Sequence, residues 1–149
     1  MITQVLVGKF CDHLPLYRQS QIYARQGVVI ERSTLADWVA GAAQLLQPLA
    51  NAVRRYVLSA GKIHTDDTPV PVLSPGRGTT RTDRLWVYAR DDRPSGDASP
   101  SAVWFQYSPD RKGEYPRGHL AGFAGTLQAD AFAGYDALFA YGQVVEAAC

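Results

Sequence analysis

The sequence has 149 residues, about one ordinary domain, and a hydrophobic content of 46% that can supply a core. A net charge of +1 gives no overall attraction to nucleic acid, although it leaves room for a local basic face. No apolar run approaches the roughly 20 residues of a membrane span, and no cleavable signal opens the sequence. Two cysteines, Cys11 and Cys149, favour reduced thiols over a disulfide scaffold or a zinc site.

The first 60 residues are predicted to be helical. Pro15 suits the first turn of a helix over 16–26, and Gly27 is typical of the residue that ends a helix. Two helices joined by a glycine turn resemble a helix-turn-helix, although plain helical packing gives the same pattern. Under the first interpretation, basic residues that flank the turn contact DNA phosphates: Arg18, Arg25 and Arg32.

The second helix is the clearest amphipathic element of the sequence. Ser33 or Thr34 is a good N-cap, and apolar residues then recur at helical spacing to about Ser59. Pro48 falls inside this run, so we expect a kink or a break there.

From residue 61 onward the pattern changes to strands. Strand-like runs at 62–73, 85–90 and 102–107 are separated by loops alone, which favours an antiparallel meander. A fourth strand is predicted at 125–130 and a fifth at 144–148, so the fold class is α/β (α+β), with helices before a mixed sheet. The large aromatic residues that alternate in these strands are predicted to lie in the core: Trp86, Tyr88, Trp104 and Phe105.

A loop rich in turn formers is predicted between the first two strands. It contains Arg77 and Arg81, which are candidates for contacts with the DNA backbone, with a solvated loop as the equal alternative. Asp83 sits in a turn context and is predicted to be a turn former.

Asp66 and Asp67 stand side by side within the first strand. Successive side chains of a strand point to opposite faces, so the two carboxylates are not expected to share a site. Pro69 and Pro71 follow, so the strand must end, bulge or lie at an edge there. An exposed turn closed by proline is the plainer interpretation of the pair.

Asp130, at the end of the predicted fourth strand, favours a functional site over an exposed turn. A meander followed by a crossover places a fourth strand beside the first, which brings Asp66 and Asp130 onto neighbouring strands. Two such carboxylates form a site for hard divalent cations such as Mg²⁺ or Mn²⁺. Two metal ions there can activate an attacking oxygen and stabilise the leaving oxygen of a phosphodiester.

Several long segments carry a family resemblance. LPLYRQSQIYARQGVVIERSTLADWV, KIHTDDTPVPVLSPGRG and YSPDRKGEYPRGHLAGFAGTLQADAFAGYDALF together resemble the central DDE region of transposases of the insertion sequence 66 family. The resemblance implies a partial ribonuclease H-like catalytic core, with an incomplete sheet, over 61–149 after the helical region of 1–60. It also implies that Asp66 and Asp130 are catalytic metal ligands, with Asp67 where the family usually has Glu.

The resemblance also implies a third acid, which lies in the family beyond a segment whose first residue looks like Cys149. We therefore expect the chain to be a truncated transposase with an incomplete triad. Its expected partners are DNA, both transposon ends and target, with a homo-oligomer left open, and its expected location is the cytoplasm of a prokaryote, at the nucleoid. A catalytically inactive module that binds DNA or the full-length transposase is the alternative, and a remnant that does not fold stably is a third hypothesis.

Overall fold

Helices come first in the chain and strands follow, which confirms the predicted α+β class. The computed structural model describes residues 1–74, 76, 78–140 and 142–148. Its contacts divide the chain into two units, Met1–Leu49 and Ala50–Cys149.

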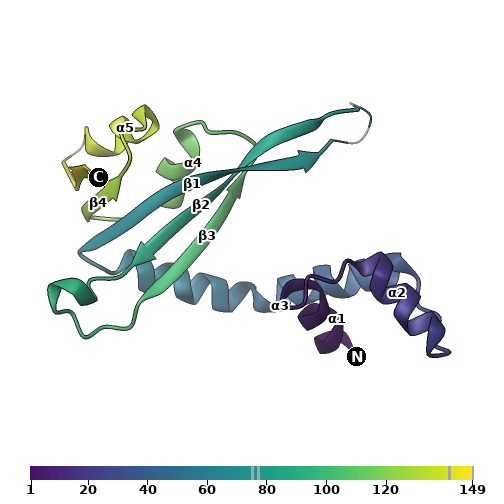
Figure 1. Cartoon of the computed structure of the whole chain (residues 1–149). Helices are drawn as coiled ribbons and strands as arrows, with labels where there is room; N and C mark the ends of the chain where they lie inside the picture. The colour runs from purple at the N-terminus through teal and green to yellow at the C-terminus, as the bar shows by residue number, and fades with distance from the viewer. Residues whose placement is uncertain (75, 77, 141, 149) are drawn as a thin grey trace. The chain divides into compact units, whose positions relative to one another are not determined.

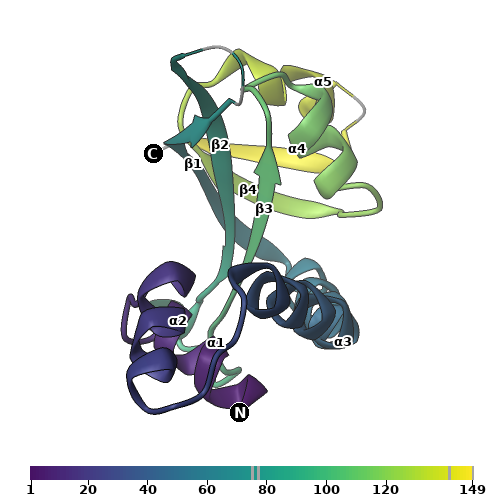
Figure 2. The same cartoon turned by 90° about the vertical axis from the view of Figure 1, so that its right-hand side faces the viewer.

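The first unit is built from helices. It contains α1 (Ile2–Phe10), α2 (Leu16–Arg25) and the first part of α3 (Arg32–Leu58). The side-chain amide of Gln19 on α2 is buried and donates to the carbonyls of Val5 and Leu14, at 3.2 and 3.0 Å. These two hydrogen bonds fasten α2 to α1 and to the turn between them, and Figure 2 shows the two helices together.

Two details of α3 correct the sequence-based expectation. The helix begins at Arg32, so Ser33 and Thr34 lie inside its first turn and do not precede it as N-caps. Of the kink or break expected at Pro48, the break does not occur, because the helix continues through this residue to Leu58. A proline removes one backbone donor and crowds the preceding turn, at a cost of about 3 kcal/mol, and a long helix can offset this through its other hydrogen bonds.

The second unit holds one mixed sheet. Its strand order is β3-β2-β1-β4-β5, with β1–β2 and β2–β3 antiparallel and β1–β4 and β4–β5 parallel, as Figure 1 shows for the first four strands. The predicted meander, crossover and fifth strand are therefore confirmed. The strands are β1 (Lys62–Leu73), β2 (Thr80–Arg90), β3 (Ala102–Ser108), β4 (Gly125–Ala129) and β5 (Val144–Ala148).

The far half of β1 forms a hairpin with β2 that extends beyond the rest of the sheet (Figure 1). Because β4 pairs only with Lys62, Ile63 and His64, the β4-side edge of β1 carries no ladder at Pro69 and Pro71. This agrees with the edge position expected of prolines in a strand.

The beginning of β2 was misjudged from the sequence. Arg81 and Asp83 were assigned to a loop and a turn, yet both lie in β2, opposite Val72 and Val70 of β1. Asp83 is fully buried and is paired with Arg81 by bonds of 2.5 and 2.8 Å, and it also accepts a hydrogen bond from the Tyr107 hydroxyl. Arg81 lowers the pKa of this carboxyl, so a residue type typical of turns is stabilised within a strand.

The core of the second unit lies on one face of the sheet. Trp86 and Tyr88 are fully buried and Trp104 is 6% exposed, as predicted. Phe105 was also placed in the core, but it is 55% exposed. It follows Trp104 directly in β3, so the alternation of side chains sends it to the opposite face, where it lies opposite Val87.

Short helices complete this unit. They are η1 (Arg93–Ser95), α4 (Glu114–His119), η2 (Ala133–Tyr135) and α5 (Asp136–Phe139). Within the described part of the chain, no helix has the length and apolar character that crossing a membrane requires.

Candidate functional site

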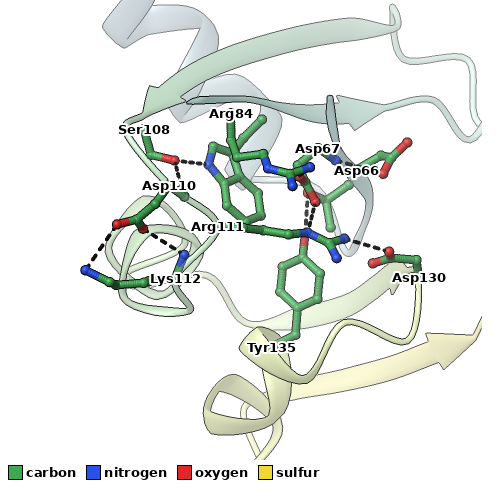
Figure 3. A network of polar contacts seen from close by, with 11 residues as sticks. Asp66, Asp67, Arg84, Ser108, Asp110, Arg111, Lys112, Asp130 and Tyr135 are labelled. Atoms are coloured by element: carbon green, nitrogen blue, oxygen red, sulfur yellow. Dashed lines mark hydrogen bonds and ion pairs between the residues drawn. The ribbon is translucent and has the colours of Figure 1, made fainter. Parts of the chain in front are cut away.

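The two adjacent acids of β1 point to opposite faces of the sheet, as predicted. Asp67 is buried at 8% exposure, in phase with buried Ile63 and Thr65, whereas Asp66 is exposed. Oδ1 of Asp66 accepts a hydrogen bond of 2.7 Å from the backbone N–H of Asp67. In Figure 3 the Asp66 carboxylate points away from the guanidinium groups that surround Asp67.

The buried Asp67 carboxylate is held by two arginines. Arg84 of β2 donates from Nη1 to Oδ2 at 3.0 Å, and Arg111 donates from Nε to Oδ1 at 2.7 Å. A buried carboxylate is strongly destabilising unless charged donors compensate for the lost water, and each oxygen here has such a donor. Arg84 and Arg111 therefore stabilise the charged Asp67 carboxylate in its buried position.

Arg111 also contacts the second predicted acid. Its Nη2 donates to Oδ2 of Asp130 at 2.9 Å, so one guanidinium joins Asp67 and Asp130 (Figure 3). The guanidinium carbon lies 4.1 Å from the centre of the Phe132 ring, within the range of a cation–π contact. Burial opposes the charge of Arg111, but the bonds to Asp67 and Asp130 outweigh it, and its pKa is raised.

The segment before α4 fixes the position of Arg111. Nε1 of Trp86 in the core donates to Oγ of Ser108 at 2.7 Å, and this hydroxyl donates to the backbone carbonyl of Asp110 at 2.5 Å. The Asp110 carboxylate in turn accepts from the backbone N–H of Lys112 at 3.0 Å and pairs with its ammonium group at 3.1 Å. These bonds hold the backbone on both sides of Arg111.

Asp130 is placed by the end of β4 and the turn after it. Tyr135, from that turn, is 1% exposed, and its hydroxyl shares a hydrogen bond of 3.3 Å with Thr65 of β1. Burial raises the pKa of Tyr135 to about 12, so the hydroxyl stays protonated. A Cβ on Gly113 would lie 2.6 Å from the carbonyl oxygen of Gly134, so the segments that carry Arg111 and Asp130 touch through backbone.

Asp66 lies on β1, and Asp130 directly follows the last residue of the neighbouring strand β4. In the parallel pairing of β1 and β4, His64 lies opposite Gln128. The β1–β4 ladder ends at this pair, two residues before Asp66 on β1. Within the described ranges, however, no cluster of three or more His, Cys, Asp or Glu residues could hold a metal ion.

The basic residues proposed for DNA contact have different surroundings. Arg18 lies on α2, Arg25 ends α2 and Arg32 begins α3, and all three are exposed. Arg81 donates hydrogen bonds to Asp83 and Tyr107. Arg77 lies outside the described residues.

Sequence reasoning missed the central place of Arg111 and the buried role of Asp67. A signal was present, because Asp67 is in phase with apolar positions of β1, and a buried acid requires cationic partners. Nothing in the spacing indicates which arginines supply them, since Arg84 and Arg111 are 17 and 44 residues away.

Comparison with known proteins identifies the class. The model of the family described as "Transposase IS66 family" matches residues 1–149, so the chain belongs to this family of transposases. Two curated relatives from Sinorhizobium fredii are named only as uncharacterized proteins, y4qI and y4hP. The chain is 41% identical to y4qI over 135 residues and 39% identical to y4hP over 136 residues. Each match covers 91% of this chain but 25% and 24% of the relative, so the chain spans about a quarter of their length. No solved structure matches it.

Proposed function

We propose that the chain is the central part of a DDE transposase and that its second unit is a ribonuclease H-like catalytic core for cutting and joining DNA. Family membership supports the role in transposition, and the strand order β3-β2-β1-β4-β5 supports the core. The expected substrate is DNA, both transposon ends and target, and the expected place of action is the cytoplasm of a prokaryotic cell. The helical region of 1–60 is proposed to contribute phosphate contacts through Arg18, Arg25 and Arg32.

One observation supports the catalytic assignment, namely the parallel pairing of β1 with β4, which brings the strand that contains Asp66 beside the strand that Asp130 directly follows. The donor set fits Mg²⁺ or Mn²⁺, which prefer carboxylate oxygens. Asp66 makes no ion pair within the described residues, and Asp130 offers a half-exposed carboxylate at the strand end. Divalent cations bound there would supply charge stabilisation for the attacking and leaving oxygens of a phosphodiester.

The chain's own residues perform the remaining tasks in this proposal. Asp66 and Asp130 hold the cations on the exposed face of β1 and at the end of β4. Asp67 stays in the core, where it orients Arg84 and Arg111. No side chain acts as a covalent nucleophile, because phosphoryl transfer depends mainly on positioning and charge stabilisation.

The test is made in a full-length transposase of the family that carries this segment. Asp66→Ala and Asp130→Ala are each expected to abolish Mg²⁺-dependent nicking of DNA that contains transposon ends while the circular dichroism spectrum is retained. Asp97→Asn is the matched control, because it removes a carboxylate that pairs with Arg90 in the segment between β2 and β3. Nicking that survives in both alanine variants overturns the catalytic assignment.

A catalytically inactive binding module is the second candidate. It is favoured by the acid set, because the described residues bring no third acid to Asp66 and Asp130. This candidate predicts DNA binding that falls steeply with salt and does not require Mg²⁺. The absence of binding at low salt, to DNA and to full-length transposase alike, would dispose of it.

A further inference from the structure

The charges around Asp67 and Asp130 balance without any bound cation. Two carboxylates, Asp67 and Asp130, face two guanidinium groups, Arg84 and Arg111. Arg84 pairs with one oxygen of Asp67. The positive charge of Arg111 is shared between the other oxygen of Asp67 and the carboxylate of Asp130. A divalent cation at Asp130 would add positive charge beside a guanidinium 2.9 Å from the same carboxylate.

The two contacts of Arg111 differ in strength. Its Nε bonds to Asp67, whose side chain is 1% exposed, whereas its Nη2 bonds to Asp130, whose side chain is 50% exposed. Water screens an exposed ion pair and lowers its contribution to about 1 kcal/mol or less, while a buried pair is strongly destabilising to break. The bond to Asp130 is therefore the one that a competing cation can replace.

The backbone around Arg111 is held independently of Asp130. Ser108 and Lys112 fix Asp110 on the preceding side, and Gly113 touches Gly134 on the following side. The guanidinium also lies over Phe132. Loss of the Asp130 contact leaves Arg111 with its bond to Asp67, its aromatic contact and its anchored backbone.

We propose that Arg111 is the internal counter-ion of the candidate metal site: it neutralises Asp130 when no cation is bound and yields Asp130 to a divalent cation while staying on Asp67. This inference rests on the proposed metal site. Under it, Arg111 is a positioning residue that neutralises the Asp130 carboxylate before the cation arrives, and it makes cation binding weaker than the carboxylates alone would allow.

The test measures Mn²⁺ binding to the 149-residue chain, with free Mn²⁺ followed by electron paramagnetic resonance. Arg111→Gln is expected to tighten Mn²⁺ binding about fivefold, the factor that corresponds to an exposed ion pair. Because this variant leaves Asp67 with one cation, the double variant Arg111→Gln with Asp67→Asn removes the guanidinium and the buried negative charge together. It is expected to fold and to show the same gain.

Arg93→Gln is the matched control, because it removes an exposed cation that pairs with Asp91 instead. Its Mn²⁺ affinity should equal that of the wild type. In an Asp130→Ala background, the loss of Arg111 should change nothing, since the carboxylate for which it competes is gone.

The outcomes separate the two proposals. Mn²⁺ binding that depends on Asp130 but is unchanged or weaker in the double variant overturns the counter-ion role and leaves the metal site standing. Binding that is absent in every variant, or that is indifferent to Asp130, overturns the metal site and the counter-ion role with it. Tighter binding in the double variant, lost with Asp130, supports both.

Discussion

Asp66 and Asp67 are chemically identical neighbours with opposite physical situations. Asp66 is exposed, while Asp67 is buried between Arg84 and Arg111. The same substitution should therefore affect function at one position and stability at the other. The face of β1 that a carboxylate occupies decides whether it is exposed to solvent or is buried and paired with arginines.

Asp67→Ala is expected to lower the free energy of unfolding by about 3 kcal/mol, because it strands two guanidinium groups that paired with a buried carboxylate. Asp66→Ala should change the free energy of unfolding by less than about 0.5 kcal/mol, because the side chain is exposed. Urea denaturation followed by tryptophan fluorescence measures both. Equal losses in the two variants would contradict this division of roles.

His119 should make stability depend on pH. Burial, assisted by the nearby positive charge of Arg54, lowers the pKa of His119 to about 4 from an ordinary 6.5. The unfolded chain therefore binds the proton more readily, so stability is complete above pH 6.5 and falls as the pH drops toward 4. After allowance for partial exposure, we expect a loss of about 1–2 kcal/mol from this group. Denaturation curves at several pH values should show a shallower decline for His119→Gln, and an unchanged slope would refute the assignment.

At the level of elements, the site depends on two connections that touch without side chains between them. Gly113 precedes α4 and Gly134 lies within η2, and a Cβ on Gly113 would meet the Gly134 backbone. This contact sets how closely the segment that carries Arg111 approaches the one that carries Asp130. Glycine is required at this position because a side chain would collide with the Gly134 backbone. The backbone conformation does not require glycine, because Gly113 does not have a positive φ.

Gly113→Ala is expected to destabilise the protein by about 1–3 kcal/mol, because backbone atoms must move to admit the methyl group. Gly118→Ala in α4 is the matched control, because its Cβ would meet nothing within 4 Å and alanine favours a helix. Thermal unfolding of the two variants gives the comparison. A Gly113→Ala protein as stable as the wild type would show that the two backbone segments can move apart without loss of stability.

The elements were predictable where a periodic pattern was strong. Alternation in 85–90 correctly placed Trp86 and Tyr88 on one face, and the same rule separated Asp66 from Asp67. The sequence misled where polar residues pair only in three dimensions, as Arg81 and Asp83 do within β2. The role of Asp66 and Asp130 as catalytic ligands remains a prediction. The position of Arg111 between two carboxylates could not be inferred from the sequence, because tertiary packing determines its partners.

At the level of the whole molecule, the core of the second unit is self-contained. Its buried cluster runs from Val57 to Val144 and includes two of the three tryptophans, Trp86 and Trp104. The first unit has 49 residues and far fewer buried side chains, among them Val5, Gln19 and Leu35. A unit of that size is marginal by itself, because a small chain buries too little apolar surface.

A fragment of residues 50–149 is therefore expected to keep the near-ultraviolet circular dichroism of its buried tryptophans and a cooperative thermal transition. Residues 1–49 alone should be largely unfolded, with helix content that rises only on addition of trifluoroethanol. An unfolded 50–149 fragment would show that the second unit, although most of its contacts are internal, cannot fold without the first unit.

The long sequence separations within the site also dictate when it can form. The β1–β2–β3 meander joins neighbouring strands, whereas Asp67 and Arg111 are 44 residues apart and Thr65 and Tyr135 are 70 apart. Long loops close slowly, so the meander should form first and the carboxylate site last during refolding. Pulse-labelled hydrogen exchange should then protect β2 before β4. A newly made chain would thus pass through a stage in which the three-stranded meander has formed but the residues around Asp67 and Asp130 have not yet come together.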